Sequence, residues 1–254
     1  MQDFIFVFLG IFFIFFMTTA GSAVVFFFKG EISPKLNATI LGFASGIMTS
    51  ASVFSLLLPS ITQAKILFGH WAFLAVFFGV IFGGIFLIFL DKRIPATTQT
   101  SSERRKARRL FWSVTLHNIP EGLAVGFAFG ACARGDVPAL CSALLLAVGI
   151  GIQNFPEGTA VALPMKSVYH SNFKAFLCGM QSGIAEPIFA VLGYFTASFI
   201  TPVQPFLLAF SAGAMLFVTA RDLLPDACKE SEDCCAWGYI IGFLTMMALD
   251  VFFA

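Results

Sequence analysis

The feature that most constrains this chain is a series of apolar blocks, each about as long as a membrane is thick. A helix needs about 20 apolar residues to cross the hydrocarbon core. The blocks cover residues 4–28, 38–58, 71–90, 111–131, 139–161, 174–198, 205–224 and 235–253. None shows the alternation of apolar and polar residues that barrel strands require. We therefore predict an all-α integral membrane protein with eight transmembrane helices.

Composition excludes several other classes of protein. Hydrophobic residues make up 58% of the chain and charged residues only 11%, whereas a soluble domain carries roughly a quarter charged residues. A soluble enzyme, a disordered chain and a nucleic-acid binder are therefore excluded. Met1-Gln2-Asp3 lacks the basic region of a signal peptide, so the first block is interpreted as a permanent span. Residues 1–254 are predicted to form a single transmembrane domain.

The distribution of basic residues predicts the orientation. Of the 15 Lys and Arg, 13 fall in the odd-numbered loops or their flanking helix ends, and the longest polar loop is 91–109. Basic residues accumulate in short loops on the cytoplasmic side. Both termini are therefore expected outside, with 91–109 as a cytoplasmic loop.

The most informative motif is a polar hexad that occurs twice inside apolar blocks. His117-Asn118-Ile119-Pro120-Glu121-Gly122 recurs 36 residues later as Gln153-Asn154-Phe155-Pro156-Glu157-Gly158. Ionisable groups inside a span cost several kcal/mol, so they normally face a cavity or a partner. The short loop 132–138 makes the two helices antiparallel neighbours, which places the hexads opposite each other.

The spacing inside each hexad predicts a polar helix face. Residues i and i+4 share a face, so His117 and Glu121 should point together with Asn118 beside them. The matching face on the next helix carries Gln153, Asn154 and Glu157. Imidazole, carboxylate and amide groups that converge near mid-membrane indicate a divalent-cation site with nitrogen and oxygen ligands.

Proline and glycine support the same interpretation. Pro120 and Pro156 each free the carbonyl four residues earlier, which is tolerated only at a cavity or where another group satisfies it. Gly122 and Gly158 permit close helix approach. Glu186, in the sixth block, is a third acidic residue well inside a span, although Glu186-Pro187 alone is also compatible with a kink-stabilising acid.

The two hexads resemble the fourth and fifth helices of the ZIP family of zinc and iron transporters, and the form Gln-Asn-Phe-Pro-Glu-Gly looks most like its GufA-type branch. The resemblance implies eight helices in a 3+2+3 arrangement, with metal carried between the central pair. On this analogy one metal is held by His117, Glu121, Gln153 and Glu157. A neighbouring metal is held by Asn118, Asn154, Glu157 and Glu186.

The resemblance also implies details of the pathway. Met48 and Ser55 match positions along the route by which metal enters from outside. Glu157 bridges the two metals. Many members carry a carboxylate where Asn154 stands, so the second site is weaker in charge here.

From these observations we predict a multi-pass protein of the cell membrane that moves zinc toward the cytoplasm, with iron, manganese and cadmium as further candidate cargoes. No cofactor is expected besides the transported divalent metal, and the resemblance is compatible with a homodimer. A proton-coupled carrier of another small solute stays open as an alternative. An intramembrane metalloenzyme has less support, because a His-Glu-x-x-His motif is absent from the sequence.

Overall fold

The computed structural model describes residues 2–28, 33–93, 102–132, 137–200 and 202–253. Within these ranges the chain is helical, with short connections and no strand. The first half contains α1 (Gln2–Ala23), η1 (Val24–Phe27), α2 (Pro34–Ala51), η2 (Ser52–Leu57), α3 (Leu58–Phe68), η3 (Gly69–Trp71), α4 (Ala72–Arg93) and α5 (Ser102–Ala131). The second half contains α6 (Val137–Tyr169), α7 (Asn172–Gly183), α8 (Ala185–Ile200), α9 (Gln204–Val218), η4 (Thr219–Leu223), α10 (Leu224–Glu230) and α11 (Glu232–Phe253).

Six helical segments of the described chain are long and apolar enough to cross a membrane. Their outer faces carry large apolar side chains, including an exposed row of Phe8, Phe12 and Phe16 on α1. Contiguous exposed apolar side chains mark a surface that contacts a membrane or a partner rather than water. The all-helical, membrane-spanning class predicted from the sequence is therefore confirmed.

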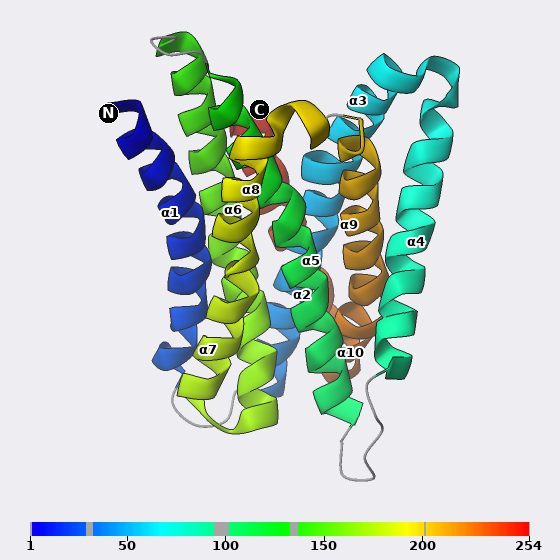
Figure 1. Ribbon diagram of the computed structural model, residues 1–254. Helices are drawn as coiled ribbons and strands as arrows, with labels where there is room; N and C mark the ends of the chain where they lie inside the picture. Colours follow the sequence, from blue (N-terminus) through cyan, green and yellow to red (C-terminus); the bar gives the residue numbers. More distant parts are fainter. Residues whose placement is uncertain (1, 29–32, 94–101, 133–136, 201, 254) are drawn as a thin grey trace.

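The longest of these segments, Pro34–Phe89, folds back on itself. The reversal occurs at Gly69, whose φ of +54° is readily adopted only by glycine. Figure 1 shows α3 and α4 joined at the top of the view, with α4 running down the edge of the bundle opposite α1.

The helices pack in pairs that are distant in sequence. The most extensive pairs are α1 with α6, α2 with α11, α4 with α9, and α5 with α8. In Figure 1 the start of α1 and the end of α11 lie at the upper end of the bundle, whereas α5 begins at the lower end. Since α6 ends at the lower end, where α5 begins, these two hexad-bearing helices run antiparallel to each other.

Two short π-helical turns interrupt the bundle next to prolines. η2 precedes Pro59 and η4 precedes Pro225. Proline offers no N–H to the carbonyl four residues earlier, so the backbone widens locally. Such π-bulges are frequent at functional sites, and here they contain Ser55 and Asp222.

One boundary prediction was wrong. The loop expected over 91–109 is shorter, because α4 continues to Arg93 and α5 already begins at Ser102. Apolar content set the expected boundaries, but Arg, Lys and Ala are good helix formers and extend α5 into the basic segment. Residues 94–101 lie outside the described part of the chain.

Candidate metal centre

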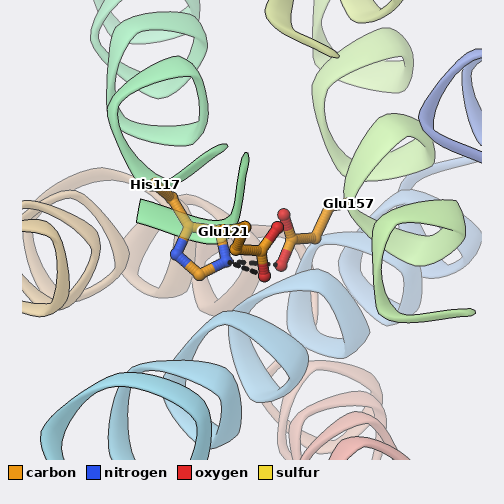
Figure 2. A group of neighbouring side chains, drawn as sticks. All are labelled: His117, Glu121 and Glu157. Atoms are coloured by element: carbon orange, nitrogen blue, oxygen red, sulfur yellow. Dashed lines mark hydrogen bonds and ion pairs between the residues drawn. The ribbon is translucent and has the colours of Figure 1, made fainter. Parts of the chain in front are cut away.

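His117 lies at the centre of the polar group that the hexads build. Its Nε2 is 3.1 Å from Oε1 of Glu121, one turn along α5. It is 3.0 Å from Oε1 of Glu157, which α6 supplies. Figure 2 shows both carboxylates converging on the same ring nitrogen. The expected i, i+4 pairing and the meeting of the two hexads are both present.

These three side chains have the composition of a metal-binding group. All are buried, and one ligand atom from each lies within 4.8 Å of the others. An imidazole nitrogen with two carboxylate oxygens is a ligand set that zinc and neighbouring divalent metals accept. A cation can satisfy both carboxylates together in a setting that water does not reach.

Around this group, a carbonyl freed by proline is satisfied by another residue, and the glycines lie at close helix crossings, as expected. The carbonyl of Leu116, four residues before Pro120, accepts a hydrogen bond from Ser211 Oγ at 3.1 Å. A Cβ at Gly122 would clash with the carbonyl oxygen of Glu186, and one at Gly158 with that of Thr18. These glycines bring α5 against α8 and α6 against α1.

The second expected ligand group also consists of buried side chains. Asn118 Nδ2 donates to the carbonyl of Ser182 at 3.0 Å. Glu186 is fully buried and accepts a hydrogen bond from Thr18 Oγ1 at 2.5 Å. Asn154 is fully buried, and neither polar atom of its side chain has a hydrogen-bond partner.

Asp250 is a polar residue that the sequence analysis missed. Its Oδ1 accepts from Gln153 Nε2 at 2.8 Å and from Ser55 Oγ at 2.7 Å. It therefore connects an expected ligand with a residue of the expected outer pathway. The signal was available, because Asp250 is an ionisable residue inside the block 235–253. Met48, the other expected pathway residue, is buried beside Thr219 of η4.

Each of the seven expected ligands carries a buried polar atom without a hydrogen-bond partner among the described residues. These atoms include His117 Nδ1, Glu121 Oε2, Glu157 Oε2, Gln153 Oε1, Glu186 Oε2, Asn118 Oδ1 and both polar atoms of Asn154. Buried polar groups are normally satisfied, since leaving one unpaired costs about 1–3 kcal/mol. A concentration of such atoms in one place indicates a site for a polar or charged occupant.

Comparison with known proteins agrees with this geometry. A family model described as "ZIP Zinc transporter" matches residues 97–250. This chain belongs to the ZIP family. Its relatives include the zinc transporter ZIP11 of Homo sapiens, which is 32% identical over 96% of this chain and 96% of its own length. The zinc transporter ZIPB of Bordetella bronchiseptica is 34% identical over 92% and 77%, and the zinc transporter GufA of Myxococcus xanthus is 30% identical over 86% and 89%.

Family membership confirms three predictions from the sequence. The recognised family is correct, and its relatives include GufA. The chain is a multi-pass membrane protein. It belongs to a family of transporters rather than of enzymes.

Near the start of α5, this ZIP protein contains a buried ion pair that was not expected from the sequence. Asp222 of η4 is buried and receives two hydrogen bonds from Arg109, from Nε at 2.7 Å and from Nη2 at 2.6 Å. Arg221 lies over the ring of Phe217. The sequence placed Arg109 in the predicted loop 91–109, so its pairing with a residue inside the bundle was not expected.

Proposed function

We propose that this ZIP protein carries a divalent metal ion across the membrane toward the cytoplasm, with zinc as the first candidate. The observation that supports this most is the cluster of His117, Glu121 and Glu157, which places an imidazole and two carboxylates in contact inside an apolar bundle. Related proteins named as zinc transporters support zinc as the cargo. Iron(II), manganese and cadmium remain candidate cargoes because the same ligand types accept them.

We propose two neighbouring positions for the metal. The first is formed by His117, Glu121, Gln153 and Glu157. The second uses Asn118, Asn154 and Glu186, with Glu157 shared. The unpaired buried atoms of all seven side chains support this assignment. The Asp250 carboxylate, which contacts both Gln153 and Ser55, supports an outer route past Ser55 and Met48.

We further propose eight spans in the 3+2+3 arrangement, with α5 and α6 as the central pair and both termini outside the cell membrane. The reversal at Gly69 supports two crossings within Pro34–Phe89. Although α5 is too polar to count among the six apolar segments, it is 30 residues long and packs among α6, α8 and α9. The excess of basic residues in odd-numbered loops supports the orientation. The homodimer stays a prediction.

The test is metal flux into sealed proteoliposomes. Purified protein is reconstituted, zinc is added outside, and entrapped fluorescent indicator reports its arrival. We expect zinc flux well above that of protein-free vesicles, with competition from iron(II), manganese or cadmium. A melting temperature that rises with micromolar zinc, measured in detergent, gives a second readout. Flux equal to that of protein-free vesicles, together with an unchanged melting temperature, would contradict metal transport and favour another solute.

A further inference from the structure

A cavity with basic and aromatic residues in its lining lies away from the metal centre, at the end of the bundle where α5 begins. It has a volume of about 400 Å³ and is lined by the first turns of α5, the last turns of α6, and α7. This volume lies in the range of small-ligand pockets. In Figure 1 the start of α5, the end of α6 and the start of α7 all lie at the lower end of the bundle.

The charged side chains that line this cavity are of one sign among the described residues. Arg104 and Arg108 line it from consecutive turns of α5, and none of the described residues lining it is Asp or Glu. A neighbouring cavity differs, because Asp222, Asp226 and Glu230 line it together with Lys229. A cavity with two guanidinium groups is suited to an anion, and guanidinium binds phosphate with two parallel hydrogen bonds.

Aromatic residues place the cavity at the edge of the membrane. Trp112 of α5 and Tyr169 of α6 both line it, and their side chains are 38% and 43% exposed. Trp and Tyr concentrate at the level of lipid headgroups, where one end of the ring is apolar and the other polar. Arg108 and Arg104 precede Trp112 by four and eight residues, so they lie roughly 6 and 12 Å closer to the start of the helix, toward the aqueous phase.

The cavity is distinct from the metal centre, because none of the seven proposed ligands lines it. Arg108 precedes His117 by nine residues, which corresponds to about 13 Å along α5. The aromatic side chains at its rim are exposed on the surface of an apolar bundle, so a ligand reaches it from the lipid layer. Basic pockets between transmembrane helices at the headgroup level are a recognised form of anionic lipid site.

We propose that this cavity binds the phosphate headgroup of an anionic phospholipid. Arg104 and Arg108 hold the phosphate, and the amide of Gln181 on α7 offers a further hydrogen-bonding group. Trp112 and Tyr169 contact the lipid at the boundary between headgroup and acyl chain. A bound lipid would then contact α5, α6 and α7 together. Of these, α5 and α6 carry the two hexads. Free phosphate shares the headgroup chemistry and is distinguished by experiment.

The test measures stabilisation by lipid and does not depend on transport. Delipidated protein in an uncharged detergent receives phosphatidylglycerol, phosphatidylcholine or inorganic phosphate, and its melting temperature is recorded. Native mass spectrometry counts the lipids retained. We expect phosphatidylglycerol to raise the melting temperature and to remain bound, with little effect of phosphatidylcholine. Inorganic phosphate at the same concentration should have at most a small effect.

Matched variants test whether the rise in melting temperature caused by phosphatidylglycerol depends on this cavity. Replacing Arg104 and Arg108 together by Gln should remove at least half of the shift caused by phosphatidylglycerol. Replacing Lys35 and Lys174 together by Gln removes the same charge from exposed positions and should leave the shift intact. An equal shift in both double variants would overturn the proposal. A full shift caused by inorganic phosphate alone would also overturn it, because the site would then take soluble phosphate.

A variant in which both arginines are changed to Lys is the control for loss of folding in the Gln variant. That variant keeps the charge but loses the bidentate geometry, so we expect a partial shift from phosphatidylglycerol. Zinc should still raise the melting temperature of the Lys variant, which would show that this variant is folded. A shift in the Gln variant as large as that in the Lys variant would count against any role of the two side chains.

Discussion

At the residue scale, His117 makes the contacts that organise the metal centre. It is the one imidazole in the buried cluster of described residues, and both neighbouring carboxylates face its Nε2. We expect His117→Ala to lower zinc uptake by at least an order of magnitude, equivalent to about 1.4 kcal/mol. Uptake is measured in proteoliposomes. His70→Ala and His170→Ala are the controls and should change it little. Near-normal uptake by the His117 variant would mean that the hexads are structural.

The two buried glutamates outside α5 separate a one-metal from a two-metal arrangement. Glu157 contacts His117, whereas Glu186 is held by Thr18 and belongs only to the second proposed position. We expect Glu157→Gln to be inactive and Glu186→Gln to keep substantial transport at saturating metal, because the second position has neutral Asn118 and Asn154 as its other ligands. Proteoliposome flux measures both effects.

A companion substitution tests the weak charge of that second position. Asn154→Asp should add a carboxylate, tighten binding there and raise the metal content toward two per chain, measured after equilibrium dialysis. Equal loss of transport from the two Glu→Gln changes, together with two metals already bound to the unmodified chain, would contradict the idea that Asn154 weakens the second position.

At the scale of the elements, glycines decide how closely the helices approach. Gly122→Ala should lower the stability of the protein by about 1–3 kcal/mol, because its methyl group would overlap the backbone of α8 at Glu186. Gly84→Ala is the matched control, since its methyl group would make ordinary contact with Phe217. Alanine should be neutral or slightly stabilising there, in line with its helix propensity. Thermal melts in detergent compare the two, and a lower melting temperature for Gly84→Ala would contradict this account.

The ion pair between α5 and η4 gives a second prediction at this scale. Arg109→Gln leaves Asp222 buried without its bidentate partner, and breaking such a pair costs about 3–5 kcal/mol. We expect a clearly lower melting temperature, with recovery in the double variant Arg109→Gln/Asp222→Asn. Arg221→Gln removes a neighbouring, exposed charge and should have a small effect. A double variant no more stable than Arg109→Gln would show that the two side chains do not act as a pair.

At the scale of the whole molecule, the orientation in the membrane is testable with tags. The start of α1 and the end of α11 lie at one end of the bundle, and α4 ends at the other (Figure 1). With basic loops inside, a tag at either terminus should be reachable from outside the cell, whereas a tag inserted at Gln99 should not. Labelling of intact cells with an impermeant reagent, with permeabilised cells as the control, measures both. Labelling of Gln99 in intact cells would reverse the orientation.

Features that depend on local spacing could be predicted from the amino-acid sequence. Block length predicted membrane helices, and the i, i+4 spacing of His117 and Glu121 predicted their contact. The repeat placed Glu157 opposite them because a short connection makes the two helices antiparallel. Each of these inferences needs only the helical period and the thickness of a membrane.

The contacts between side chains distant in sequence became known from the three-dimensional fold. Asp250 contacts Gln153, 97 residues away, Arg109 pairs with Asp222, 113 residues away, and Thr18 donates to Glu186 across 168 residues. No local period encodes such pairs, because the packing of whole helices sets them. The glycines at close crossings and the π-turns before prolines determine that packing. For the same reason the basic start of α5 could not be recognised as part of the bundle until α9 and η4 were seen beside it.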